Sequence, residues 1–427
     1  DDDAGFTAPC GVWQDLAHVN CGIIMITRGE GGSNSVGNEA GPDLGLRREN
    51  EDRASHVRMG TVDIFNIDRA DFYYNTSAPL TAQVWDDEET LRRIVRVIRE
   101  TQPSILVGWP PSFKFGHGNH QYAGRLVWEA AEAAADPTRF PEQFEGLGAV
   151  EPWQVKKILD QEIPGWNPYP GEGGVVGEDC TTGFIPAADN PFTVVGTWSG
   201  YESPYVWADG NTAGVAGGTA KTWAQVGAEG GRAPPTQART MLQDAVDPTC
   251  VRYGVMESLV PMQPNGAAGG GMDEALLFGA AVADPGGFPL ETLFTFDAES
   301  YFVAPGEPFT VDVEITLPEG ESAPTGTVEM QAPEGWDVSG PVDTSEGSTV
   351  DAQFTVTPAA DAAHMRYRLS ATFDGGDVTA YNDTRVEVVP PVEGRFERSH
   401  TSAEYDEWTE ANDVYIFDRS EAVADMG

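Results

Sequence analysis

The stretch SILVGWPPSFKFGHGNHQYAGRLVWEAAEAAA, residues 104–135, decides the fold class of the N-terminal part of the chain. Its first six residues form a short apolar run, which is typical of a buried strand in a parallel sheet. A loop rich in Pro, Phe and Gly follows, and the segment from about Gln121 to Ala135 predicts a helix. Loops at the carboxyl ends of parallel strands are where such folds carry their sites. This loop is therefore the first candidate for a functional site.

Strand-like and helix-like segments alternate in the same way upstream. The helix at 86–101 is clearly amphipathic, and Pro103 ends it. The alternation predicts an α/β fold with a Rossmann-like parallel sheet and helices on both faces. Residues from about Pro137 to Pro289 lack clear periodicity and are interpreted as a loop-rich completion of the same domain. The expected strands are Gly22–Thr27 and Thr61–Ile67, and the expected helices are Gly5–Val19, Leu46–Met59 and Asp86–Thr101.

From Leu293 the pattern changes to short segments in which apolar and polar residues alternate, separated by turn signals such as Pro305-Gly306-Glu307. This pattern predicts an all-β, immunoglobulin-like sandwich that ends near Val389. The expected organisation is a first domain over 1–290, a sandwich over 291–390, and a linker or the start of a further segment over 391–427. The expected strands are 294–296, 309–315, 327–330, 352–356 and 367–373.

The chain has 68 acidic and 25 basic residues among 427, a formal net charge of −43. Acid excess along the whole chain with only four lysines is typical of adaptation to high salt, where repulsion between carboxylates is screened. A cation-binding acidic tail is the alternative, and it predicts long blocks of like charge that the sequence lacks. The charge also argues against binding to nucleic acid or anionic membranes. No apolar run is long enough to span a bilayer.

The four cysteines, Cys10, Cys21, Cys180 and Cys250, do not have the spacing of a zinc ribbon. Cys180 and Cys250 could pair in an exported protein, and buried free thiols are an equal alternative. Asn75-Thr76-Ser77 and Asn382-Asp383-Thr384 match glycosylation acceptors, a pattern that is common by chance.

Two of the six histidines, His117 and His120, lie in the loop before the predicted helix. Three-residue spacing lets both imidazoles face the same side of a turn. Two surface histidines or a helix cap is the simpler interpretation of this motif alone. Asp1-Asp2-Asp3 is a second feature, and a frayed terminus is its simpler interpretation. Together, however, carboxylates and imidazoles at neighbouring strand ends suit a hydrolytic zinc site with one position left to water.

At this point the sequence resembles the LmbE/PIG-L family of zinc-dependent N-acetylglucosaminyl deacetylases. The family has an Ala-His-Pro-Asp-Asp-Glu-type motif after its first strand and a His-x-Asp-His-type motif after a later one. The resemblance spans roughly residues 1–290 and implies that the chain begins inside the first motif, with the first strand missing. With the charge, it indicates a halophilic archaeal source. The matching segments are Asp1–Asp3, Thr27–Gly32 (a Thr-x-Gly-Glu-type loop), Leu46–Glu51 (an Arg-x-x-Glu-type helix start) and Gly116–Gln121.

The resemblance assigns a role to each matching residue. It implies that Asp1 is the general base, that Asp2 and His120 hold Zn²⁺, that His117 assists at the oxyanion or leaving group, and that Arg48 contacts an N-acetylated sugar or glycoconjugate. The family's first histidine ligand is not in the chain, and Asn119 replaces an Asp that usually orients the first histidine of the later motif. A carboxylate restored there would stabilise the imidazolium, so Asn119→Asp is expected to maintain or improve activity.

Two other functions compete with the hydrolase. A dinucleotide-binding protein would need a G-x-G-x-x-G motif after a strand, and the sequence has none with the proper acidic partner. The other is a non-catalytic, glycan-binding surface protein with a relic deacetylase domain. Glu30 is either an orienter of a ligand or a solvated loop carboxylate. Four tryptophans could line a sugar subsite, although core packing is the simpler role: Trp166, Trp198, Trp207 and Trp223. The sandwich favours an extracellular or cell-surface location.

Overall fold

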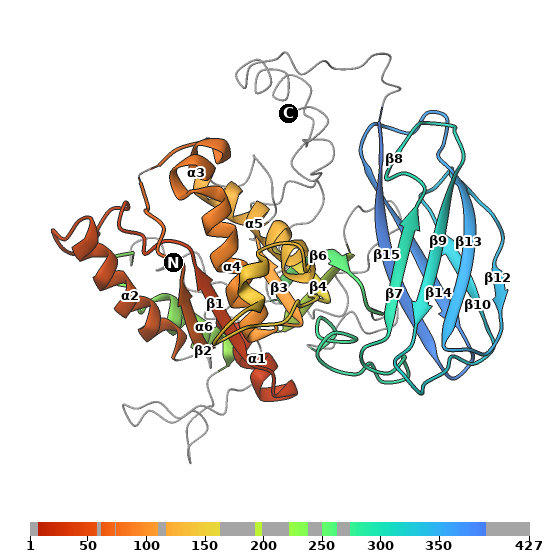
Figure 1. Ribbon diagram of the computed structural model, residues 1–427, viewed down its shortest axis with the longest axis horizontal. Helices are drawn as coiled ribbons and strands as arrows, with labels where there is room; N and C mark the ends of the chain where they lie inside the picture. Colours follow the sequence, from red (N-terminus) through yellow and green to blue (C-terminus); the bar gives the residue numbers. More distant parts are fainter. Residues whose placement is uncertain are drawn as a thin grey trace.

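The computed structural model describes residues 7–57, 61–72, 74–109, 117–162, 193–198, 222–237, 250–262 and 274–389. A helix-rich part and an all-β part lie side by side (Figure 1). No helix in the described residues is long and apolar enough to cross a membrane.

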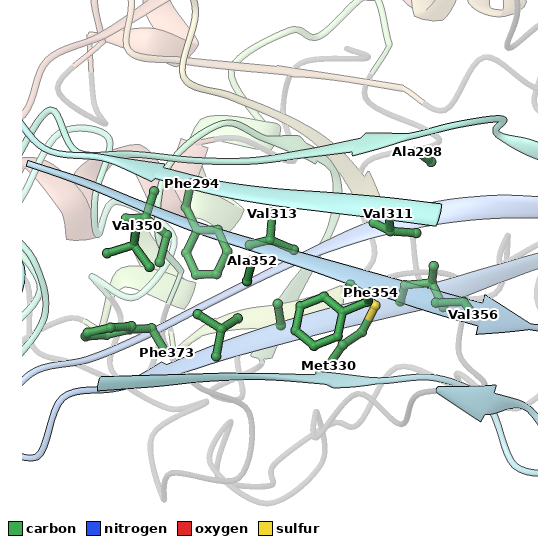
Figure 2. Packing of buried hydrophobic residues seen from close by; sticks show 14 of the residues in the cluster. Phe294, Ala298, Val311, Val313, Met330, Val350, Ala352, Phe354, Val356 and Phe373 are labelled. Atoms are coloured by element: carbon green, nitrogen blue, oxygen red, sulfur yellow. The ribbon is translucent and has the colours of Figure 1, made fainter. Parts of the chain in front are cut away.

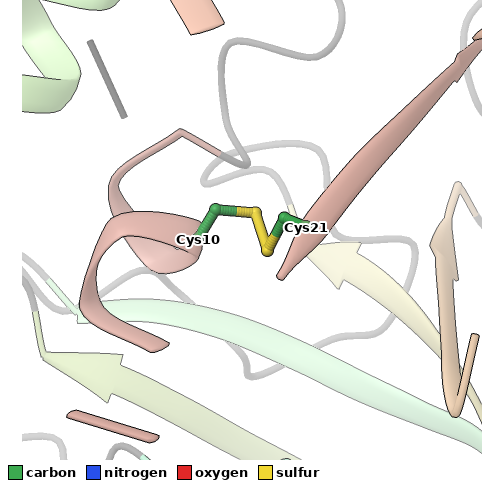
Figure 3. Close-up of a disulfide and its surroundings, with 2 residues drawn as sticks. All are labelled: Cys10 and Cys21. Carbon is green, nitrogen blue, oxygen red and sulfur yellow. A yellow bond between two sulfur atoms is a disulfide. The ribbon is translucent and has the colours of Figure 1, made fainter. Parts of the chain in front are cut away.

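The chain enters through α1 (Thr7–Ala17) and β1 (Cys21–Met25). A disulfide joins Cys10 of α1 to Cys21 at the start of β1 (Figure 3). The Cys180–Cys250 pairing considered above involves Cys180, which lies outside the described residues. β1 pairs in parallel with β2 (Thr61–Asn66), as the alternation predicted. The helix between them, α2 (Pro42–His56), begins four residues earlier than expected, because proline suits the first turn of a helix.

The next helices form the core on which the site rests. α3 (Ala78–Trp85) and α4 (Asp87–Thr101) precede β3 (Ile105–Gly108), and α5 (Gly118–Ala135) follows it. The apolar stripe of α4 is buried against α5, as its periodicity predicted. The residues that α5 turns inward include small alanines, which let the two helices approach closely. The buried residues of this core include Leu91, Ile94, Val95, Ile98, Leu126, Ala130 and Ala134.

A second sheet runs through the region interpreted above as loop-rich. Its strands are β4 (Lys157–Glu162), β5 (Thr193–Trp198) and β6 (Cys250–Ser258), and its order is β3-β4-β6-β5. β3 and β4 are parallel, whereas β6 runs antiparallel to both of its neighbours. The expected parallel sheet is therefore corrected to a mixed one here. The described part of 137–289 also contains regular elements that the sequence did not predict. α6 (Trp223–Gly231) also lies in this region and packs against α1.

Buried charged residues explain why β4 was missed. Lys157 is 2% exposed and Asp160 is 5% exposed, so charged side chains lie where an apolar run would be expected. The periodicity of apolar residues is the main sequence signal for a strand, and these two residues remove it.

The all-β part contains two sheets that share one apolar core (Figure 2). Their orders are β12-β10-β14-β15-β8 and β11-β13-β9-β7. β13 shows why these strands form, because its residues are alternately exposed and buried along its length. The strands are β7 (Leu293–Ala298), β8 (Phe302–Val303), β9 (Phe309–Thr316), β10 (Gly326–Gln331), β11 (Asp337–Val338), β12 (Val342–Thr344), β13 (Thr349–Thr357), β14 (Arg366–Asp374) and β15 (Thr379–Val388).

Polar side chains of β15 join the sandwich to β6. Asn382 Nδ2 donates to the carbonyl oxygens of Ser258, at 2.8 Å, and Phe294, at 2.6 Å. Arg385 Nη1 donates to the carbonyl of Met256, at 2.9 Å. Asp383 is fully buried, and burial raises the pKa of its carboxyl group although Arg385 opposes the shift. These bonds hold the two parts in one fixed contact.

Candidate functional site

The two histidines lie at the start of α5, which begins at Gly118. The helix thus starts three residues before the predicted position near Gln121, and His120 belongs to the helix and not to the loop. His117 is the N-cap residue, and its Nδ1 accepts the backbone N–H of Asn119 at 3.3 Å. The ring centroids of His117 and His120 are 3.9 Å apart with an interplanar angle of 32°. The expectation that both imidazoles share one side of the turn is therefore confirmed.

Two aromatic rings flank this pair. Trp109, just after β3, meets the ring of His120 edge-on at a centroid distance of 3.9 Å. Tyr74 lies 5.2 Å from the ring of His117, and 70% of its surface is exposed. The imidazoles thus lie between the end of β3 and the segment that leads into α3.

Asn119, which lies between the two histidines in the sequence, is buried. Its Nδ2 donates to Asp71 Oδ1 at 3.2 Å, and its Oδ1 accepts from Asn75 Nδ2 at 3.1 Å and from Thr81 Oγ1 at 2.9 Å. The polar side chain at position 119 therefore anchors the helix start, and it contacts His117 only through its backbone N–H. The expected role of residue 119 as a side-chain orienter of His117 is not what the geometry shows.

The start of α5 approaches the segment before α3 very closely. The Gly118 N–H donates to the carbonyl of Asn75 at 2.7 Å, and a Cβ at position 118 would collide with the Asn75 side chain. Only glycine allows this approach. Asn75 and Asn382 are both buried, at 9% and 0% exposure, so neither glycosylation match can carry a glycan in this fold.

The Gly-rich loop after β1 is tied to the same place. Glu30 Oε2 accepts the Arg28 N–H at 3.1 Å, and Oε1 accepts the Asp71 N–H at 2.9 Å. Asp71 in turn accepts the Gly31 N–H through Oδ2 at 3.1 Å. Glu30 is thus neither free in solvent nor directed at a histidine, because its carboxylate organises the loop backbone.

Arg48 holds the loop from the side of α2. Its Nη1 donates to the carbonyl of Gly29, and its Nη2 donates to the carbonyl of Ser33 at 2.7 Å. Gly29 has a φ of 68° and lies so close to the Arg48 guanidinium that a Cβ would crowd it. These contacts show how Arg48 shapes the loop, while the predicted contact with a substrate stays a prediction.

The predicted carboxylates Asp1 and Asp2 lie outside the described residues. The expectation that Asp2 and His120 bind the same metal ion therefore stays a prediction. Within the described part of the chain, no group of three His, Cys, Asp or Glu residues could hold a metal ion. His120 offers an imidazole nitrogen, which suits zinc, and a tetrahedral site would need further ligands. The described residues therefore fit part of a zinc site.

Some residues of the site could not be predicted from the sequence. Asp71 lies in an irregular segment after β2, and no local motif marks it. Asn75 and Thr81 bind Asn119 across the fold, so only the tertiary structure reveals them. Of the four tryptophans considered for a sugar subsite, Trp223 is 1% exposed and packs in the core, whereas Trp166 and Trp207 lie outside the described residues.

Residues 1–131, which include the histidine pair, the Gly-rich loop and Arg48, match the model of the PIG-L family, described as GlcNAc-PI de-N-acetylase. The chain carries a PIG-L domain at its N-terminus. Residues 303–374 match the NPCBM-associated, NEW3 domain of alpha-galactosidase, so the C-terminal β-rich part contains a NEW3 domain.

Curated relatives of the PIG-L domain share one description. A 1D-myo-inositol 2-acetamido-2-deoxy-alpha-D-glucopyranoside deacetylase of Streptomyces scabiei (strain 87.22) is 38% identical over 79 residues, 18% of this chain and 23% of that protein. One of the same name from Kineococcus radiotolerans is 28% identical over 205 residues, 46% of this chain and 50% of that protein. The chain thus spans 23% of the length of the first relative and 50% of the length of the second.

A solved structure of N,N'-diacetylchitobiose deacetylase from Pyrococcus horikoshii, complexed with its inhibitor MPG, aligns at 16% identity. The alignment covers 37% of this chain and 55% of that chain with a TM-score of 0.30, which supports no conclusion.

Proposed function

We propose that this protein is a zinc-dependent hydrolase that removes an acetyl group from an N-acetylated amino sugar or a related N-acyl substrate. The PIG-L match over residues 1–131 and the deacetylase descriptions of the relatives support this proposal. The observation that carries it is the pair His117 and His120, which lies at a helix start beside an ordered Gly-rich loop. A helix N-terminus also favours developing negative charge.

In this proposal, His120 and Asp2 hold the zinc ion. Zinc in such a site supplies Lewis acidity toward the amide carbonyl and a water of lowered pKa. Asp1 takes the proton of the attacking water and returns it to the leaving amine, a role that contributes about a hundredfold or more.

His117 is assigned to the developing oxyanion. Its Nδ1 accepts a backbone N–H, so in neutral His117 the proton is on Nε2. Nε2 is therefore the ring atom that can donate a hydrogen bond to the oxyanion of the tetrahedral intermediate. Arg48, which binds carbonyls of the Gly-rich loop, is proposed to contact the substrate.

Alanine substitutions at the two histidines test the assignment in the full-length protein. His120→Ala should lower the zinc content and the activity together, because it removes a ligand. His117→Ala should keep the zinc and lower kcat about a hundredfold to a thousandfold, as expected for an oxyanion donor. The measurements are deacetylation of an N-acetylglucosamine derivative and zinc per chain, with His364→Ala, an exposed histidine of the sandwich, as the matched control.

Three outcomes would contradict this proposal. Wild-type protein that binds no zinc and releases no acetate would favour a relic domain. Loss of zinc from His117→Ala alone would exchange the two roles. Full activity in both variants would mean that the motif is only a surface turn, and the proposed hydrolase function would be rejected.

A further inference from the structure

We propose that Asp71 is a positioning residue that couples the Gly-rich loop to the histidine pair. This role deepens the proposed deacetylase function and rests on it. The inference comes from a relay of hydrogen bonds that crosses from the loop after β1, through Asp71, to the start of α5.

On the loop side, Asp71 makes two contacts in opposite directions. Its backbone N–H donates to Glu30 Oε1 at 2.9 Å, and its Oδ2 accepts the Gly31 N–H at 3.1 Å. Glu30 Oε2 also accepts the Arg28 N–H at 3.1 Å. These hydrogen bonds therefore fix the turn of the Gly-rich loop relative to Asp71.

On the helix side, Asp71 Oδ1 accepts the amide N–H of Asn119 at 3.2 Å. Asn119 lies between His117 and His120 in the sequence, is 6% exposed, and is held from the other side by Asn75 and Thr81. A buried side chain with three fixed partners leaves the backbone of this turn little freedom. The placement of both imidazoles thus depends on Asn119, and through it on Asp71.

The directions of these bonds require this pair of residue types. Asp71 accepts from two donors, which an ionised carboxylate can do with both oxygens. Asn119 must donate toward Asp71 and accept from Asn75 and Thr81, which an amide can do and a carboxylate cannot. Bonds to an ionised carboxylate are stronger than neutral ones, so the coupling is substantial.

The two single substitutions, Asn119→Asp and Asp71→Asn, should therefore both lower kcat. The first leaves too few hydrogen-bond donors, and the second leaves too few acceptors. Asn119→Asp replaces the amide donor that Asp71 accepts by a second carboxylate about 3 Å away, and like charges at that distance repel strongly. In Asp71→Asn, the new amide NH₂ group must face one of two donors. It points either at the Asn119 NH₂ group or at the Gly31 N–H, so one hydrogen bond is lost in either orientation. This geometry reverses the expectation from the sequence that Asn119→Asp would maintain or improve activity.

The double variant Asp71→Asn with Asn119→Asp should restore the network. The amide introduced at 71 donates toward 119 and still accepts the Gly31 N–H through its oxygen. The carboxylate introduced at 119 accepts that bond together with those from Asn75 and Thr81. The local charge is unchanged, and each of these four hydrogen bonds again has a donor and an acceptor.

The test compares kcat, KM, zinc content and thermal stability of the full-length wild type, both single variants and the double variant. Each single variant should lose about 10- to 100-fold in kcat, as do other substitutions of residues that orient catalytic groups. The double variant should recover most of that loss. Asp351→Asn, which neutralises an exposed carboxylate on β13, is the control and should match the wild type.

The rescue distinguishes positioning from a general effect on folding. If both singles and the double variant lose kcat in additive steps, or if only thermal stability changes, the role of Asp71 is refuted while the deacetylase proposal stands. If the wild type itself releases no acetate, the deacetylase proposal fails and this role is overturned with it.

Discussion

The β-sandwich and the N-terminal part of the chain differ in how many of their charged side chains are buried. In the sandwich, apolar side chains of both sheets fill the interior, and most charged residues of strands such as β13 point outward. In the N-terminal part, several charged groups are buried and bind backbone carbonyls. Arg99 is 1% exposed and donates to the carbonyls of Ala133, Ala134, Asp136 and Arg139 around the end of α5. Polar interiors of this kind fix loops and helix ends, which is where a catalytic site is built.

The two parts also differ in how surface acid is balanced. Helices of the N-terminal part pair arginine with glutamate one turn away, as in Arg93 with Glu89 and Arg125 with Glu129. Between residues 293 and 389 the only arginines are Arg366, Arg368 and Arg385, and no lysine occurs. Arg368 and Arg385 both turn toward buried Asp383. The acid on the sandwich surface is therefore mostly unpaired.

Low salt should expose this difference most strongly. The screening length grows from about 3 Å at 1 M salt to about 10 Å at 0.1 M, so repulsion among unpaired carboxylates rises. We expect the protein to lose structure in dilute buffer, with the sandwich unfolding first. Calorimetry across a salt series, with limited proteolysis to identify the surviving fragment, measures this order.

Sucrose at matched osmolality is the control for the salt series. It does not screen charge, so its general stabilisation by surface exclusion should be smaller than that of salt and should not favour the sandwich over the N-terminal part. A melting temperature that is the same in molar salt and in dilute buffer would contradict the prediction. A single transition at every salt concentration would show instead that the contact between β6 and β15 makes the two parts unfold together.

A core substitution in the sandwich should separate stability from activity. Phe354 is fully buried in β13 between the sheets (Figure 2). Phe354→Ala should destabilise the protein by about 3–5 kcal/mol through lost burial and a cavity. Its kcat at 25 °C should not change, since the histidine pair lies in the other part. Urea titration and the deacetylation assay measure both effects.

Asp351→Ala, an exposed position on the same strand, should change stability by less than about 0.5 kcal/mol and serves as the control for Phe354→Ala. A fall in kcat without a fall in stability would mean that the sandwich core communicates with the site, against the division drawn here.

The same contrast explains how far the sequence could predict the structure. The strands β9 and β13 of the sandwich follow from alternation, because apolar side chains fill their buried positions. β15 does not alternate, because Asn382 and Asp383 are buried in it, and the sequence did not predict it. The helix α4 follows from its apolar stripe in the same way. β4 could not be predicted in this way, because Lys157 and Asp160 are buried in it. In a sequence, charged residues indicate an exposed position.

In the site, the motif alone placed His117 and His120 correctly on one side of a turn. The roles of Asp71, Asn75 and Thr81 depend on hydrogen bonds between segments distant in sequence, which no local pattern encodes. The roles of Asp1, Asp2 and Arg48 stay predictions from the family resemblance.

The smallest expected effect concerns Lys157, whose Nζ donates to the carbonyls of Leu276, at 3.1 Å, and Phe278, at 2.6 Å. Burial lowers its pKa from 10.5 to about 7, although Asp284 opposes the shift. Above pH 7 the unfolded chain then binds the proton that the folded lysine has lost, so the free energy of unfolding rises with pH, by at most about 1.4 kcal/mol per unit. Lys157→Met should flatten this rise between pH 7 and 9 in urea titrations, whereas Lys156→Met, its half-buried neighbour, should keep it. Equal slopes in wild type and Lys157→Met would mean that the buried amine stays charged, and that two backbone carbonyls with Asp284 nearby are enough to hold that charge in the interior.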